Sequence, residues 1–89
     1  MHAPAQKQQF IVLCGQIVGH KHFETVYGFD GRRFDDRAAA IGHGFTLHRS
    51  DDFNIGVVAD GQLVSLDWME QPVDTDPKLL ANIAKQIGI

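Results

Sequence analysis

The residues with the clearest metal-ligand chemistry are His20, His22 and Glu24, which alternate along the segment GHKHFE. Side chains at i, i+2 and i+4 of a β-strand point to the same face, so two imidazoles and one carboxylate could ligate one divalent cation. A closed structural site has four ligands, however, and the sequence offers no clear fourth. A polar hairpin end explains the same residues. A divalent-metal-binding protein or metal-dependent enzyme is therefore one alternative.

A second cluster contains Arg32, Arg33 and Arg37, and guanidinium groups bind phosphates and carboxylates well. Three aspartates are interleaved with them, so local ion pairs are the competing interpretation. The chain carries a net charge of −3, and residues 46–89 hold three Lys or Arg against seven Asp or Glu. Nucleic-acid-binding domains are usually basic, so the charge argues against that partner. A nucleic-acid or anion binder using these arginines is the other alternative.

The remaining polar groups give weaker signals. His43 and His48 could titrate near neutrality, but a histidine at a helix C-terminus is stabilised by the helix dipole without any further role. The acidic pairs at 51–52 and 74–76 do not match an EF-hand loop. Cys14 lies within an apolar run and is expected to act as a small hydrophobic residue. Because no phosphate-binding loop, nucleophile elbow or redox motif is present, the sequence predicts no catalytic residue and no cofactor.

The length of 89 residues, with 44% hydrophobic and 21% charged residues, is typical of one small globular domain. We expect residues 1–8 to form a flexible N-terminal tail and residues 9–89 to form the domain. A domain of this size buries only about 60% of its unfolded surface, which leaves little room for an enzyme cleft. Neither a signal peptide nor an apolar run of ~18 residues is evident, so a cytoplasmic location without a membrane partner is expected.

The strongest structural signal is the stretch from Phe53 to Trp68, in which Asp60 and Gly61 separate two apolar runs. Both turn residues tolerate positive φ angles, so they favour a type I′ turn and a β-hairpin. The expected cross-strand partners are Ala59 with Gln62, Val57 with Val64, Ile55 with Leu66 and Phe53 with Trp68. This register brings apolar residues together on one face. We expect Phe53 and Trp68 to be buried beneath the C-terminal helix.

The rest of the chain predicts a second hairpin and two helices. The hairpin joins strands at 10–18 and 21–29, with Phe10 opposite Phe29. One helix is expected at 36–43 between an Asp35 cap and Gly44, and the other at 77–87 between an Asp76 cap and Gly88. These elements predict an α+β fold with a four-stranded antiparallel sheet in ββαββα order and both helices mainly on one face.

That arrangement would leave an apolar patch on the open face of the sheet. Its residues are Ile11, Leu13, Ile17, Val26, Val58 and Leu63. Because monomers rarely expose such a patch, the leading interpretation is a small non-enzymatic interaction or regulatory domain that forms a homodimer, or binds a protein partner, through this face. With one helix on each face, the same residues would instead be buried within a monomer.

Overall fold

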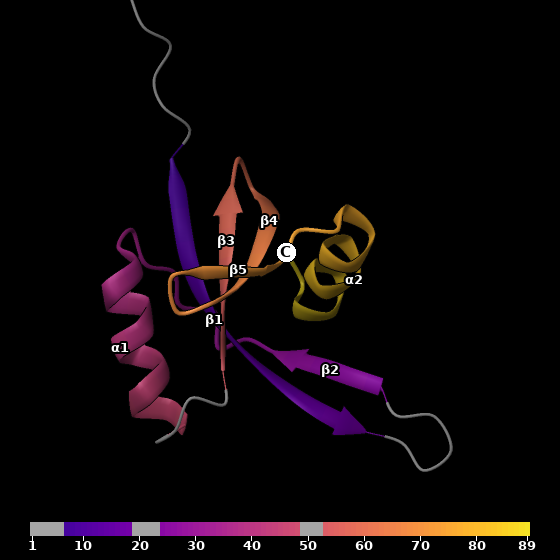
Figure 1. The fold of residues 1–89 in the computed structure, drawn as a ribbon, viewed down its shortest axis with the longest axis horizontal. Coiled ribbons are helices and arrows are strands. Elements are labelled where there is room, and N and C mark those ends of the chain that lie inside the picture. Colours follow the sequence, from indigo (N-terminus) through magenta and orange to yellow (C-terminus); the bar gives the residue numbers. More distant parts are fainter. Residues whose placement is uncertain (1–6, 19–23, 49–52) are drawn as a thin grey trace, which may run out of the picture.

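A computed structural model describes residues 7–18, 24–48 and 53–89. It confirms an α+β fold with an antiparallel sheet and two helices, but the sheet has five strands rather than four (Figure 1). The strands are β1 (Gln8–Val18), β2 (Glu24–Gly28), β3 (Asn54–Ala59), β4 (Gln62–Trp68) and β5 (Gln71–Asp74), and the helices are α1 (Arg37–His48) and α2 (Pro77–Ile87).

Strand β1 connects two parts of the sheet, whose strand order is β2-β1-β3-β4-β5. The first half of β1, from Gln8 to Leu13, pairs with β3, and the second half, from Cys14 to Val18, pairs with β2. The β1–β2 ribbon therefore extends away from the other three strands, as Figure 1 shows.

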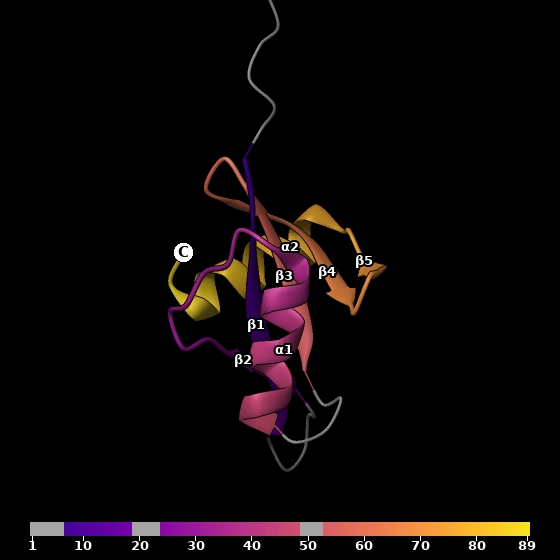
Figure 2. The ribbon, with the colours of Figure 1, turned by 90° about the vertical axis from the view of Figure 1, so that its left-hand side faces the viewer.

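The two helices cover opposite faces of the sheet, so the prediction that both lie mainly on one face is wrong. Figure 2 shows α1 in front of the strands, with α2 behind them. The reason lies in β1, where Phe10 and Val12 pack on the α1 side and Ile11 and Leu13 pack on the α2 side. Because both faces of β1 are apolar, each face needs its own covering helix.

The α2-side cluster consists of Ile11, Leu13, Val58, Leu63, Leu66, Leu80 and Ile83. It contains four of the six residues expected at an open interface, namely Ile11, Leu13, Val58 and Leu63, and all four are buried. Val26 on β2 is partly exposed, and the side chain of Ile17 lies outside the described residues. The apolar sheet face therefore belongs to the core of one chain, which removes the argument for self-association through it.

The β3–β4 hairpin has the predicted turn, because Asp60 and Gly61 both have positive φ angles, of 53° and 76°. Its register agrees with the prediction near the turn, where Val58 pairs with Leu63. A β-bulge follows, and Val57 then pairs with Ser65 rather than Val64. The extra residue moves every later pair by one position.

The bulge separates Phe53 from Trp68, so the prediction that they form a buried cross-strand pair is wrong. Phe53 is 2% exposed and packs in the α1-side cluster, which consists of Phe10, Val12, Ala40, Phe53, Ile55 and Val57. Trp68 is 44% exposed instead of lying beneath α2.

Strand β5 lies between β4 and α2, where the predicted four-stranded sheet had no strand. Met69 has a φ of 56°, and the chain reverses there so that Gln71 pairs with Trp68. Pro72 fits this strand because β5 lies at the edge of the sheet, where a missing N–H group is tolerated.

The register of the β1–β2 hairpin also differs from the prediction. Cys14 pairs with Gly28 and Gly15 with Tyr27, three positions away from the expected Phe10–Phe29 register. A Cβ atom added at Gly15 would lie only 3.1 Å from the Tyr27 ring, so glycine permits this close approach. The β1 residues preceding Cys14 are paired with β3 instead.

Both helix ends of α2 are confirmed. Asp76 accepts a hydrogen bond from the Lys78 N–H, and Gly88 has a φ of 80°. Helix α1 differs, because Asp36 rather than Asp35 caps it and the helix continues through Gly44. Gly44 is buried against the ring of Phe53, so its missing side chain serves packing rather than helix termination.

Candidate interaction surface

The site begins with Asp67 on β4, whose side chain is the only buried charged group among the described residues. Arg37, at the start of α1, donates from Nη1 to Asp67 Oδ2 at 2.6 Å. Ser65 Oγ donates to the other carboxylate oxygen of Asp67, and Asn54 Nδ2 donates to its backbone carbonyl at 3.2 Å. A buried carboxylate is costly unless it is paired and hydrogen-bonded, and these contacts meet both needs.

The same arginine also holds the chain just beyond Trp68. Arg37 Nη1 donates to the Met69 carbonyl at 3.0 Å, and the guanidinium group lies 4.9 Å from the centre of the Phe10 ring. Asp67 and Met69 flank Trp68 in the chain, so one arginine side chain fixes the position on each side of the tryptophan. The backbone that carries Trp68 is therefore braced against α1.

We call residues 67–74 the β4–β5 ribbon; they comprise the end of β4, the turn and β5. Asp67 points toward α1, and because strand side chains alternate, the next residue, Trp68, points to the other face. Its indole is not covered by α2 and is 44% exposed, and Val73 on β5 is 59% exposed. The ribbon thus presents two large apolar side chains on a firmly held backbone.

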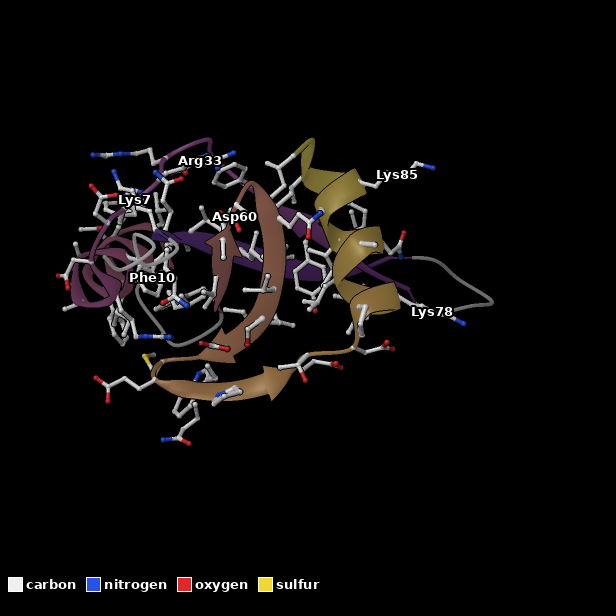
Figure 3. All side chains as sticks on the ribbon, turned by 90° about the horizontal axis from the view of Figure 1, so that it is seen from above. Lys7, Phe10, Arg33, Asp60, Lys78 and Lys85 are labelled. Atoms are coloured by element: carbon white, nitrogen blue, oxygen red, sulfur yellow. The ribbon has the colours of Figure 1, made fainter. Side chains whose placement is uncertain are left out.

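The charged residues of the β4–β5 ribbon beyond Trp68 are both acidic. Glu70 in the turn is exposed, and Asp74 closes β5. The sequence contains neither Lys nor Arg between residues 50 and 77. Lys78 and Lys85 follow on α2, and Figure 3 shows both projecting away from the sheet. The β4–β5 ribbon is therefore an acidic surface with an aromatic residue within it.

The predicted metal ligands fall largely outside the described residues. His20 and His22 belong to the segment 19–23, and Glu24 is described only as the first residue of β2, without its side chain. Within the described ranges, no group of three or more His, Cys, Asp or Glu residues could hold a metal ion. Metal binding by His20, His22 and Glu24 stays a prediction.

The three arginines of the predicted anion site point to different partners. Arg33 donates to Gln9 Oε1 at 3.3 Å, Arg32 lies 5.6 Å from the centre of the Phe34 ring, and Arg37 binds Asp67. A phosphate site requires donors that converge on one position. These contacts do not provide one, although anion binding itself stays a prediction.

His43 forms an ion-pair contact within the α1 side of the molecule. Its Nε2 lies 2.7 Å from Asp30 Oδ2, and its ring lies 5.2 Å from that of Phe34. Partial burial raises the pKa of Asp30, but hydrogen bonds from His43 and the Arg32 N–H, together with their positive charges, outweigh it and lower the pKa overall. The pair ties the segment before α1 to the middle of that helix.

The other polar candidates have structural contacts or lie outside the described residues. Asp74 and Asp76 each accept a hydrogen bond from a backbone N–H, at 2.8 and 3.1 Å, near the start of α2. The pair at 51–52 and the side chain of His48 are outside the described part of the chain. Cys14 is half-buried and borders a small cavity of about 240 Å³ with Val12 and Leu47.

Comparisons with protein-family models, with curated proteins and with solved structures return no match for this chain. Within the described ranges, neither helix has the length and apolar character needed to cross a membrane. The candidate interaction surface is therefore inferred only from the contacts, exposure and charge of its residues. The sequence predicted a buried Trp68, and this prediction is wrong because the bulge at Val64 has no clear sequence signal.

Proposed function

We propose that this chain is a non-enzymatic interaction domain that binds a cationic polypeptide segment through the β4–β5 ribbon. The observation that carries the proposal is the exposure of Trp68 on a backbone held on both sides by Arg37. Tryptophan is among the residues most enriched at binding hot spots. A site whose backbone is fixed before binding loses less conformational entropy when the partner arrives.

Charge indicates the chemistry of the partner. Glu70 and Asp74 lie within the ribbon, and no cation occurs in the sequence from 50 to 77. A partner carrying lysine or arginine would be attracted to this surface, and an acidic partner would be repelled. Cation–π contact between such a side chain and the indole would add to the attraction.

Selection of peptides from a displayed library of random dodecapeptides tests the proposal. We expect the peptides that bind the full chain to be enriched in Lys and Arg relative to the starting library. Trp68 is the only tryptophan in the chain, so its fluorescence should shift when a selected synthetic peptide is added. Affinity should fall as salt is raised, because ionic screening weakens the charge attraction.

Two matched variants locate the binding surface. Trp68→Ala should weaken binding of the selected peptides about tenfold or more, as expected for a hot-spot residue. Phe45→Ala on α1 removes an aromatic side chain of similar exposure, 45%, and should leave affinity unchanged. Equal affinity of the Trp68→Ala variant and the wild type, or enrichment without basic residues, would contradict the proposal.

A second candidate is the predicted homodimer, now formed through the outer face of α1. From Ala38 to Leu47 this helix contains no Asp, Glu, Lys or Arg. Phe45 contacts the Phe53 ring edge-on but remains 45% exposed, with small residues at 38 and 42 on the same side of the helix. A two-fold interface must be complementary to itself, and this face offers both a large side chain and shallow positions to receive it. The acidic ribbon, by contrast, would repel a second copy.

Sedimentation velocity tests this second candidate. We expect the wild type to dimerise at micromolar concentration and Phe45→Glu to be monomeric, because it places a charge in the contact. Val73→Glu, at an exposed apolar position on β5, serves as the control and should not change the association. A wild type that sediments as a monomer would reject the homodimer.

A further inference from the structure

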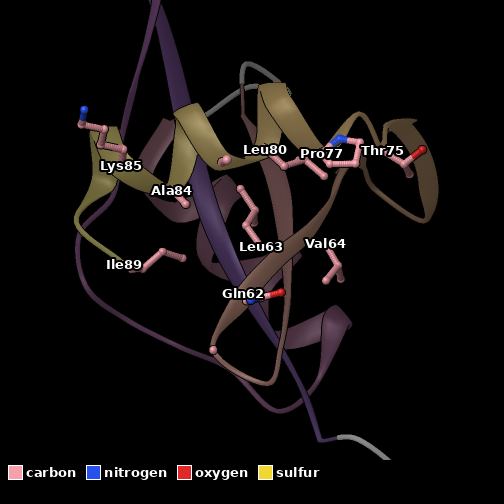
Figure 4. Close-up of a pocket in the computed structure, with 11 residues that line it drawn as sticks. Gln62, Leu63, Val64, Thr75, Pro77, Leu80, Ala84, Lys85 and Ile89 are labelled. Carbon is pink, nitrogen blue, oxygen red and sulfur yellow. The ribbon is translucent and has the colours of Figure 1, made fainter.

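A groove lies between α2 and β4, on the side of the sheet opposite α1 (Figure 4). Its volume is about 600 Å³, inside the range of roughly 300 to 1,000 Å³ that small-molecule sites occupy. Leu63, Leu80, Ala84 and Ile89 supply apolar lining. Leu63 and Leu80 also belong to the α2-side cluster, so the core fixes the shape of this wall.

Three polar side chains line the groove beside this apolar wall, namely Gln62, Thr75 and Lys85. Figure 4 shows Lys85 and Thr75 toward opposite ends of the groove, with Leu63 and Leu80 between them. Lys85 is the only charged side chain that lines the groove, and no Asp or Glu side chain lines it. Within the described part of the chain, no carboxylate lies within the 4.0 Å ion-pair distance of Lys85.

We propose that the groove binds a small amphipathic monocarboxylate, with its apolar body along the Leu63–Leu80 wall and its carboxylate near Lys85. Covering the wall removes apolar surface from water, which provides the main driving force. In Figures 3 and 4 the Lys85 side chain points outward from α2, and its flexible four-carbon stem allows the ammonium group to turn toward a carboxylate at the rim of the groove. Positive charge at this groove contrasts with the acidic β4–β5 ribbon, so an anion should prefer the groove.

This proposal does not depend on the proposed function, because the groove and Trp68 are separate features. Replacing Trp68 with Ala should leave carboxylate binding unchanged. Filling the groove should likewise leave binding of basic peptides at the β4–β5 ribbon unchanged. The two proposals can therefore fail separately.

Titration of the full chain with sodium octanoate, followed by ¹H–¹⁵N NMR, tests the groove. We expect saturable shifts at groove residues, and binding of neutral octan-1-ol that is about three- to tenfold weaker. Lys85→Met should reduce octanoate affinity to that of octanol. Lys78→Met removes a charge from α2 at a position that does not line the groove, and should have no such effect.

A blocking variant tests the position independently of charge. Ala81 lines the groove but is exposed, so Ala81→Phe fills the groove without entering the core. We expect it to keep the wild-type far-ultraviolet circular dichroism spectrum and to lose the octanoate shifts. The proposal is overturned if octanoate produces no saturable shifts, if the shifts survive Ala81→Phe, or if Lys85→Met binds octanoate as the wild type does.

Discussion

The two faces of the sheet are held by different physical means. On the α1 side, small residues bring the helix close to the sheet, with Gly44 against the Phe53 ring, and Arg37 reaches into the sheet to pair with buried Asp67. On the α2 side, Leu80 and Ile83 bury large aliphatic side chains in the α2-side cluster. The α1 side therefore depends on close packing and on a buried ion pair, whereas the α2 side depends on burial of apolar side chains.

This difference matters for function, because each surface proposed for binding depends on its own face. The ion pair on the α1 side fixes the backbone around Trp68, although alternation along β4 directs the indole to the other face. The apolar packing on the α2 side fixes the wall of the groove. Disturbing one face should affect its own binding surface more than the other.

The largest effect should come from Arg37→Ala. It leaves the buried Asp67 carboxylate without its cation and should lower the free energy of unfolding by about 3 to 5 kcal/mol. Urea unfolding measures the loss. A double variant, Arg37→Met with Asp67→Leu, removes both charges and should be more stable than Arg37→Ala. If the double variant is less stable than Arg37→Ala, buried charge is not the cause.

Ile83→Ala should be the corresponding test on the α2 side. Ile83 is almost fully buried, so truncation leaves a cavity and should cost about 2 to 4 kcal/mol. Leu79→Ala, at a partly buried position on the same helix, should cost less. Equal costs for the two truncations would show that the α2-side cluster relaxes to fill the space.

Gly44→Ala should show how tightly α1 packs. The added Cβ would lie 2.6 Å from Cζ of Phe53, a buried ring that cannot easily move. The expected loss is about 1 to 3 kcal/mol, although alanine favours a helix more than glycine does. Gly42→Ala is the matched control, because its added Cβ would have no atom within 4 Å apart from its chain neighbours and the nearby backbone of α1, and it should stabilise the protein slightly. Stabilisation by both changes would show that α1 can shift away from the sheet.

The general architecture was predictable because it depends on local signals. The caps of α2 and the Asp60–Gly61 turn follow from residue types that tolerate few other backbone conformations. The helix faces, the β5 strand and the exposure of Trp68 depend on the bulge at Val64 and on which half of β1 pairs with which partner. These features depend on which strands pair and in which register. Alternative long-range pairings compete for the same strands, and one sequence alone does not show which pairing is more stable.

The candidate site was predictable only in part for a related reason. Arg37 was recognised as a possible anion ligand, but its partner Asp67 is 30 residues away in the chain. Ile11 and Leu13 were assigned to an open face because both helices were expected on the other side of the sheet, whereas each face has its own helix. Sequence spacing finds residues that share a strand or helix, whereas this site joins separate elements.

Trp68→Ala should have a modest effect on stability. Full burial would imply a loss of about 3 to 5 kcal/mol, but with 44% of the residue exposed we expect about 1 kcal/mol. Phe53→Ala, at the buried aromatic position first expected to pair with Trp68, should cost the larger amount. Thermal unfolding of both variants measures the contrast. A loss above 3 kcal/mol for Trp68→Ala would place the indole in the core and contradict its role as an exposed anchor.

The smallest effect on stability should come from the Asp30–His43 contact. Its contribution should change with pH, whereas the buried residues of the α2-side cluster have no titrating group. Because the folded state lowers the pKa of Asp30, this carboxylate contributes stability above its unfolded pKa of about 3.9 and loses it as pH falls through the folded value. Wild type should therefore be more stable than Asp30→Asn at pH 5, and the difference should shrink toward pH 3. Urea midpoints at the two pH values measure it, with Asp60→Asn as the control in an exposed turn. A difference that stays constant with pH would show that Asp30 acts through its hydrogen bonds rather than through the charge of its carboxylate.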